Sequence, residues 1–225
     1  MKSDKAELGG KVWRILVVDD HPLVRAGLAS LIKGEADMEV CGETGDISAA
    51  LELVRTQSPD LVTVDLSLAD GNGLELVKRL VASHSEIKIL VCSMHDEALF
   101  AYRALKAGAM GYIGKEQATT HVIDAIRQVL KGKIWLSADM TERALQGLAN
   151  GKADATAATV DRLSDRELEI FGLIGRGMGP SEIAEQLHLS VKTIETHREN
   201  IKKKLNLRSG SELTRLAMQW ALEQS

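Results

Sequence analysis

Five short apolar runs that alternate with helical stretches, between residue 13 and about residue 130, limit the fold of this chain most strongly. Between the runs, apolar residues recur three and four positions apart, as at Val24, Leu28 and Leu31, which is the spacing of a helix. Strands that are apolar on both faces and joined by helices predict a doubly wound α/β domain with a five-stranded parallel sheet. The runs read WRILVV, MEVC, LVTVDL, IKILVC and MGYI.

A change in composition after Leu136 predicts the end of this domain. Residues 137–160 are small and polar and rich in alanine and threonine, which favours one helix followed by a flexible linker. The chain then divides into an α/β domain, a linker with one helix, and a small all-α domain. We place these three parts at residues 11–134, 135–160 and 161–225.

The third part begins with a strong helix-start signal. Ser164 and Glu167 have the spacing of a capping box, and Leu163 with Leu168 supplies the matching hydrophobic staple. Gly179 and Pro180 suit the N-cap and first position of a second helix. In all, the pattern predicts four helices, the last three at residues 180–187, 191–205 and 210 to about 220.

Composition indicates an ordinary soluble protein. The chain has 44% hydrophobic and 27% charged residues and a net charge of −4, which argues against a protein coated with nucleic acid or anionic lipid. The two cysteines, Cys41 and Cys92, lie in strand-like segments, so we expect buried, reduced thiols. Because the N-terminus lacks a signal-peptide core and no apolar run approaches ~20 residues, we expect a cytoplasmic protein without a membrane partner.

Polar residues stand where four of the predicted strands end. Asp19 and Asp20 follow the first strand, Asp65 the third, Ser93 the fourth and Lys115 the fifth. Carboxyl ends of parallel strands meet at one edge of a sheet, so these groups should lie together. Three clustered carboxylates need a cation, and hard oxygen ligands suit Mg²⁺. Asp65, alone on its strand, is the candidate nucleophile towards phosphorus, with charge on the transferred oxygens neutralised by Lys115 and the metal.

A local basic stripe stands out in the all-α part. Residues 192–208 carry six basic residues against two acidic ones. On a helix, Ile194, Ile201 and Leu205 share the inward face, and Arg198 lies towards the packed side. With the preceding helix and turn, this pattern predicts a helix-turn-helix that binds double-stranded DNA. The candidate DNA-binding residues are Lys192, Glu195, Thr196, Glu199 and Lys203.

These residues resemble a known family over nearly the whole chain. The strand-end set resembles the flavodoxin-like receiver domain of two-component response regulators, and the run LSDRELEIFGLIGRGMGPSEIAEQLHLSVKTIETHRENIKKKLNLRS resembles the LuxR-type helix-turn-helix. Together they resemble a NarL/FixJ-class regulator. The resemblance implies a transcription factor, not an enzyme, that receives a phosphoryl group from a sensor histidine kinase and forms a homodimer when active.

The resemblance also implies individual roles. Asp65 would be the phosphoacceptor, and Mg²⁺ would be held by Asp19, Asp20, Asp65 and the carbonyl of Ser67. Ser93 and Lys115 would bind the phosphoryl oxygens. Tyr112 would occupy the family's switch position, although an aromatic ring packed at the sheet edge remains the alternative.

The chain departs from the family pattern in two places. Ala69 stands where the family usually has proline, so we expect a less rigid loop after Asp65. Ser93 replaces the commoner threonine and keeps the hydroxyl. Among the histidines, we expect His21 at the entry of a helix and His95 in a loop or on the surface.

Two other functions stay open on the sequence. A magnesium-dependent phosphatase also forms an aspartyl-phosphate on a similar sheet, but this chain has Ser67, not an acid, two residues after Asp65 and no cap insertion. A regulator that works by partner binding alone would not need an intact acidic cluster.

Overall fold

The computed structural model of the chain describes residues 11–142, 160 and 162–223. These residues form two compact units that meet in the sequence between Met140 and Thr141. The sequence boundaries at 134 and 160 stay predictions.

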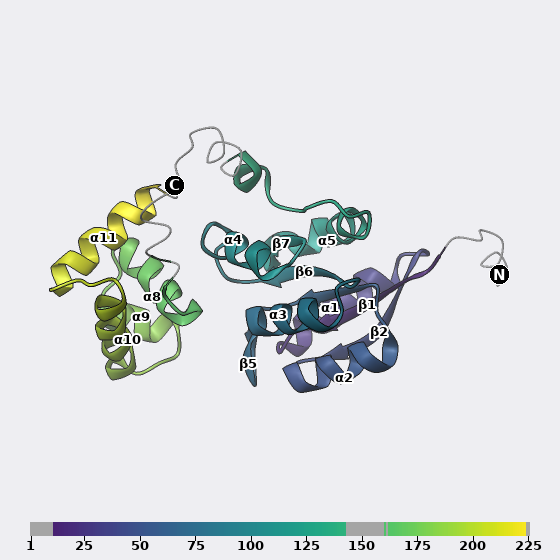
Figure 1. Cartoon of the computed structure of the whole chain (residues 1–225), viewed down its shortest axis with the longest axis horizontal. Coiled ribbons are helices and arrows are strands. Elements are labelled where there is room, and N and C mark those ends of the chain that lie inside the picture. The colour runs from purple at the N-terminus through teal and green to yellow at the C-terminus, as the bar shows by residue number, and fades with distance from the viewer. Residues whose placement is uncertain (1–10, 143–159, 161, 224–225) are drawn as a thin grey trace. The chain divides into compact units, whose positions relative to one another are not determined.

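A five-stranded parallel sheet forms the centre of the first unit, as predicted (Figure 1). The strand order is β2-β1-β3-β6-β7, so the chain first builds towards one edge and then crosses over β1 to the other. Residues 15–18 of β1 and all four residues of β3 are buried, because helices cover both faces. The strands are β1 (Trp13–Val18), β2 (Met38–Thr44), β3 (Leu61–Val64), β6 (Lys88–Ser93) and β7 (Gly111–Gly114).

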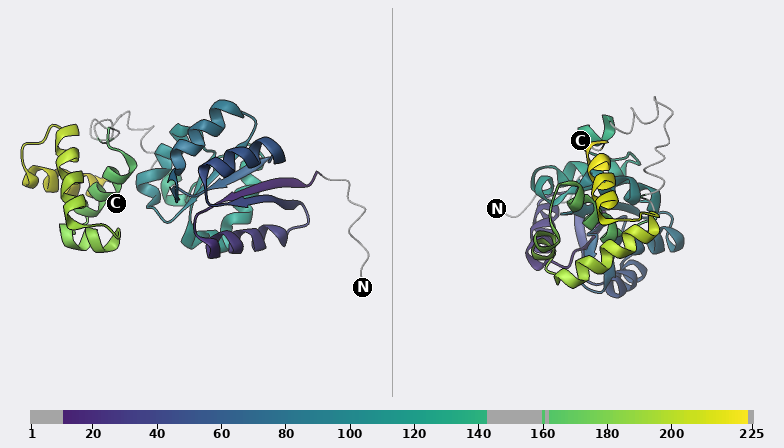
Figure 2. Two further views of the ribbon diagram at one scale, coloured as in Figure 1. Left: turned by 90° about the horizontal axis from the view of Figure 1, so that it is seen from below. Right: turned by 90° about the vertical axis from the view of Figure 1, so that its left-hand side faces the viewer.

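Helices cover the sheet in two layers (Figure 2). Helices α1 and α5 pack together on one face, and α2, α3 and α4 cover the other. The core beneath α1 and α5 is made of aliphatic side chains such as Ile15, Val17, Leu90, Ile113 and Ile126. The helices are α1 (Pro22–Lys33), α2 (Ile47–Gln57), α3 (Gly73–Ser83), α4 (Glu97–Ala107) and α5 (Lys115–Leu130).

The loop after Asp65 contains a small hairpin that the sequence did not predict. Strands β4 (Ser67–Leu68) and β5 (Gly71–Asn72) pair antiparallel. At the turn between them, the Asp70 carboxylate accepts hydrogen bonds from the backbone of Ile47, at 2.8 and 3.1 Å. The loop with Ala69 is therefore fastened to the first turn of α2.

Four helices form the second unit, at close to the predicted positions: α8 (Asp165–Gly175), α9 (Pro180–Gln186), α10 (Val191–Lys204) and α11 (Gly210–Glu223). The predicted capping box is present, because Ser164 accepts from the Glu167 amide and Glu167 accepts from the Ser164 amide. Rings of Phe171 and Trp220 lie 5.4 Å apart and join α8 to α11.

Cys92 is buried as predicted, but Cys41 is only half-buried, because β2 is an edge strand. Residues 138–142 are helical, and the rest of the predicted linker up to residue 159 lies outside the described residues. In the part of the chain that is described, no helix combines the length and apolar character needed to cross a membrane.

Candidate functional sites in the acidic cluster and the basic helix

Backbone pairing at the end of β1 and β3 positions two carboxylates side by side. The amide of Asp19 donates to the Thr44 carbonyl and the amide of Asp65 to the Val18 carbonyl, both at 2.9 Å. The side chains of Asp19 and Asp65 are 1% and 2% exposed. We call Asp19, Asp20 and Asp65 the acidic cluster. The prediction that these acids share one edge of the sheet is confirmed.

Lys115 neutralises part of the cluster's charge. Its Nζ lies 2.7 Å from Oδ2 of Asp19 and 2.7 Å from Oδ2 of Asp65. Burial alone would lower the pKa of Lys115, but the hydrogen bonds to the two carboxylates raise it above the usual value. Lys115 therefore stays protonated, and its ammonium group can neutralise negative charge on or beside Asp65.

The phosphoacceptor candidate is buried but not fully hydrogen bonded. Burial raises the pKa of Asp65, the hydrogen bond from Lys115 works against this rise, and the charge of Asp19 adds to it. Oδ1 of Asp65 has no hydrogen-bond partner among the described residues. The backbone is also crowded, because a Cβ at Gly73 would lie 2.0 Å from the Asp65 carbonyl oxygen. Glycine at the start of α3 is thus required for the helix to approach the Asp65 backbone this closely.

Oxygen donors in the acidic cluster fit a magnesium ion. Asp20 is more exposed than Asp19 and Asp65, and its Oδ1 lies 2.6 Å from Nδ1 of His21. Ligand atoms of Asp19, Asp20, His21 and Asp65 all lie within 4.8 Å of one another. A buried carboxylate oxygen without a partner, in a set dominated by hard oxygens, suits Mg²⁺. His21 also forms the N-cap of α1, the helix-entry position that was expected.

Ser93, Tyr112 and His95 form a second group beside the cluster. Ser93 ends β6 and is 1% exposed, and its Oγ accepts a hydrogen bond from the His95 amide at 3.3 Å. Tyr112 is completely buried, and its hydroxyl donates to the His95 carbonyl at 2.7 Å. Its pKa is raised, first by burial. The side chain therefore points inward from β7.

His95 was expected in a loop or on the surface, and it is in a loop, but it makes specific contacts there. Its Nε2 lies 3.0 Å from Oγ of Ser67, and its ring lies 4.7 Å from that of Phe100. The contact joins the loop after β3 to the loop after β6. Sequence reasoning missed it because nothing in the local pattern around His95 indicates a partner 28 residues away.

The basic helix has the predicted inner and outer faces. Ile194, Ile201 and Leu205 are buried, as expected for the packed side. Helix α9 packs on α10 through Ile183 and Ala184, and the turn between the helices contains His188 in the left-handed region at φ 52°. This arrangement is the predicted helix-turn-helix.

Charges on α10 are partly paired. Glu195 lies 3.5 Å from Arg198, and Glu199 lies 2.7 Å from Lys202. The hydrogen bond from Lys202 lowers the pKa of Glu199. Lys192 and Lys203 are exposed and have no ion-pair partner in the described part of the chain, so they present the unpaired positive charge of the helix. Thr196 is exposed between them, and its hydroxyl donates to the Lys192 carbonyl.

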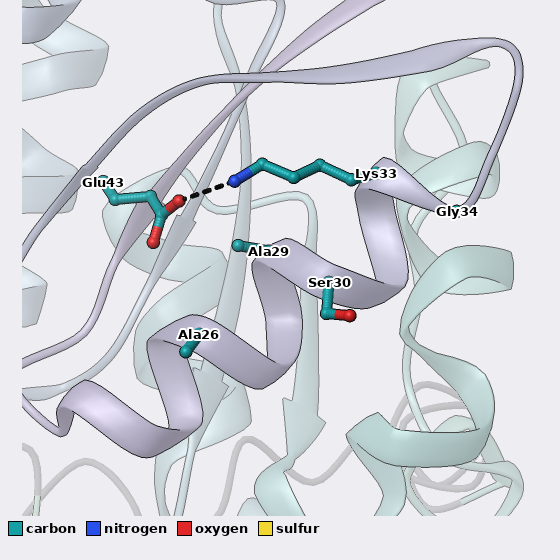
Figure 3. Close-up of a pocket in the computed structure, with 6 residues that line it drawn as sticks. All are labelled: Ala26, Ala29, Ser30, Lys33, Gly34 and Glu43. Atoms are coloured by element: carbon teal, nitrogen blue, oxygen red, sulfur yellow. Dashed lines mark hydrogen bonds and ion pairs between the residues drawn. The ribbon is translucent and has the colours of Figure 1, made fainter.

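A separate pocket between α1 and β2 carries no comparable chemistry (Figure 3). Small side chains line it, together with the ion pair of Lys33 and Glu43 at 3.1 Å. We therefore take the acidic cluster and the exposed face of α10 as the candidate functional sites among the described residues.

The doubly wound unit with its acidic cluster, followed by the helix-turn-helix unit, defines a phosphorylation-dependent regulator of transcription. Residues 15–127 match the response regulator receiver domain, and residues 161–217 match the bacterial regulatory proteins of the luxR family. The chain belongs to the NarL/FixJ class of two-component response regulators.

Individual relatives agree with this assignment. The oxygen regulatory protein NreC of Staphylococcus carnosus (strain TM300) is 37% identical over 209 residues, which cover 91% of this chain and 96% of NreC. Among solved structures, a LuxR-family two-component response regulator from Aurantimonas sp. SI85-9A1 is 33% identical, with a TM-score of 0.56. The match covers 60% of this chain and 97% of the Aurantimonas chain. The Salmonella typhimurium response regulator RcsB is 25% identical over 90% of this chain and 96% of its own, with a TM-score of 0.55.

Proposed function

We propose that a sensor histidine kinase phosphorylates Asp65, and that this phosphorylation controls DNA binding by α10. The observation that carries the proposal is the position of Lys115, whose Nζ lies 2.7 Å from both Asp19 and Asp65. A buried carboxylate beside a fixed cation, with one oxygen unpartnered, is suited to attack phosphorus.

The transfer uses groups of this chain in defined roles. A carboxylate oxygen of Asp65 attacks the phosphorus of a phosphohistidine, and the new P–O bond forms as the P–N bond breaks. The bonding electron pair stays on the imidazole, which takes up a proton from solvent and leaves as neutral histidine. Lys115 and the hydroxyl of Ser93 bind phosphoryl oxygens. Mg²⁺, held by Asp19, Asp20, Asp65 and the Ser67 carbonyl, would offset negative charge between the carboxylates and the phosphoryl group.

A small-molecule phosphodonor tests the acceptor directly. Phosphoramidate with Mg²⁺ should add one phosphoryl group, located at Asp65 by mass spectrometry of peptides. Asp65→Asn should stay unlabelled, whereas Asp46→Asn, at an exposed helix cap outside the cluster, should be labelled as fully as the parent. Full labelling of Asp65→Asn would rule out the acceptor assignment.

Metal dependence tests the proposed ligands. Asp20→Ala should slow labelling mainly because it weakens Mg²⁺ binding, so a high concentration of Mg²⁺ should restore part of the rate. If no Mg²⁺ concentration restores any labelling, Asp20 has another role.

The enzyme alternative predicts a different result with the same protein. A phosphatase would turn over p-nitrophenyl phosphate many times, whereas we expect no catalytic cycling. Ser67, which lies where a second acid would be needed, contacts His95 and supplies no carboxylate.

For DNA, we propose that α10 lies in the major groove. Lys192 and Lys203, about 16 Å apart along the helix, contact phosphates or guanine edges near the two ends. Glu195, Thr196 and Glu199 lie on the stretch between them. Support comes from the exposure of this face and from the similarity to RcsB, a response regulator that interacts with DNA.

A further inference from the structure

The chain that leaves α5 follows the outer edge of β7 (Figure 1). Trp135 pairs in parallel with Gly111: its amide donates to the Met110 carbonyl at 3.0 Å, and its carbonyl accepts from the Tyr112 amide at 2.9 Å. We call residues 133–137 the linker strap. Because β7 is the last strand of the sheet, the strap covers an edge that would otherwise expose backbone groups.

Side-chain packing also fixes the strap. Trp135 is partly buried and packs against the core beneath α5. A Cβ at Gly111 would lie 3.0 Å from both the Cβ and the carbonyl oxygen of Trp135. The backbone of β7 approaches the strap this closely only because residue 111 is glycine.

Glu97, the first residue of α4, holds the end of the strap. Its Oε1 accepts a hydrogen bond from the Ser137 amide at 2.9 Å. The Ser137 hydroxyl in turn accepts from the Met140 amide at 3.2 Å and so caps the helical residues 138–142. Helix α4 thus contacts the start of the segment that leads to the DNA-binding unit.

Residues 93–96 connect the N-terminal end of α4 to Ser93, which lies beside the acidic cluster. Ser93 lies four residues before Glu97, and its hydroxyl accepts from the His95 amide. Tyr112 contacts both this loop and the linker strap. Its hydroxyl donates to the His95 carbonyl, and its amide donates to the Trp135 carbonyl. A shift of the loop at residues 93–96 therefore changes the position of Glu97 relative to Ser137.

We propose that Glu97 is a positioning residue that couples the acidic site to the linker. In the unphosphorylated protein its carboxylate holds Ser137. When Ser93 turns towards a phosphoryl group on Asp65, residues 93–96 rearrange and Ser137 is released, which frees the linker helix from α4. This inference rests on the proposed function, because phosphorylation of Asp65 is its input.

Amide hydrogen exchange of Ser137, measured by NMR on the full chain with and without phosphoramidate and Mg²⁺, tests the coupling. In the parent, phosphorylation should speed the exchange of this amide roughly tenfold, the effect of losing a hydrogen bond to a charged group. Glu97→Ala should exchange this fast before phosphorylation and show no further change. Glu97→Gln keeps an oxygen acceptor, so it should exchange more slowly than Glu97→Ala before phosphorylation and should still speed up on phosphorylation.

Three results would overturn the coupling. The first is equal exchange of Ser137 in the unphosphorylated parent and Glu97→Ala. The second is unchanged exchange in a parent that mass spectrometry shows to be fully labelled on Asp65. The third is an equal acceleration by phosphorylation in the parent and Glu97→Ala, which would leave Glu97 a purely structural role. Absence of label on Asp65 would instead overturn the proposed function, and the comparison of unphosphorylated proteins would still decide whether Glu97 holds Ser137.

Discussion

The burial of Asp65 lowers the stability of the folded state at neutral pH. Burial raises its pKa above the usual 3.8, which means that folding disfavours the ionised carboxylate. The folded state therefore loses stability as the pH rises from 3.8 through the higher pKa of the folded protein. Lys115 reduces this cost but does not abolish it.

We therefore expect Asp65→Asn to stabilise the first unit at pH 7 in the absence of Mg²⁺. The gain should shrink as the pH falls to 3.8, because Asp65 then becomes protonated in the unfolded state as well as in the folded state. Urea unfolding at several pH values, with EDTA present, measures this gain. A destabilised Asp65→Asn at pH 7 would show that its ion pair with Lys115 outweighs the cost of burial.

Among the elements, helix α2 depends on a cap that the distant β4–β5 hairpin supplies. The Asp70 carboxylate accepts from the Ile47 amide at the first turn of α2, whereas Asp46, the N-cap residue in the sequence, makes no side-chain cap bond. We expect Asp70→Ala to cost about 1 kcal/mol of unfolding free energy. Asp46→Ala is the control and should cost less. Equal losses in the two variants, measured by urea unfolding, would argue against the distant cap.

For α10, the two kinds of proposed DNA contact respond differently to substitution. Lys203→Ala should weaken binding to all sequences and lower the salt slope by about one, because one fewer counterion is released. Lys33→Ala removes the same charge from the other unit and should leave the slope unchanged. Titrations on selected and scrambled duplexes at several salt concentrations give the slopes, and an unchanged slope for Lys203→Ala would remove that phosphate contact.

Glu199→Ala should do the opposite. Binding to unrelated DNA should hold or rise, since repulsion from phosphate is lost and Lys202 is released from its ion pair. Discrimination at one base pair should fall by roughly 1–3 kcal/mol. The ratio of affinities for selected and scrambled duplexes decides this, and an unchanged ratio would mean that Glu199 reads no base.

The elements that the sequence predicted are those with a clear period or cap. Five apolar runs and the capping box at Ser164 led to the sheet and to α8, and parallel strand ends brought Asp19, Asp65 and Lys115 together. The β4–β5 hairpin was missed because strands of two residues have no period. The strap at Trp135 and the cap by Asp70 were missed because each depends on a backbone partner far along the chain.

At the scale of the whole molecule, one helix-turn-helix makes few base contacts, so a single chain should discriminate poorly between sequences. We expect the phosphorylated form to bind as a two-fold dimer on paired half-sites about one helical turn apart. Analytical ultracentrifugation with selected DNA, with and without phosphoramidate, should show two chains per duplex in the phosphorylated sample. A one-to-one complex under both conditions would contradict the dimer.

The central claim is that a phosphoryl group on Asp65 changes DNA binding by α10. The most direct measurement is the affinity of the full chain for a duplex selected from a random pool by the phosphorylated protein, with the extent of labelling determined in each sample. Labelled parent should bind at least about fivefold more tightly than unlabelled parent, within the usual range of coupling between two sites, and Asp65→Asn should show no change with phosphoramidate. Equal affinities of labelled and unlabelled parent, or the same rise in Asp65→Asn, would contradict the account.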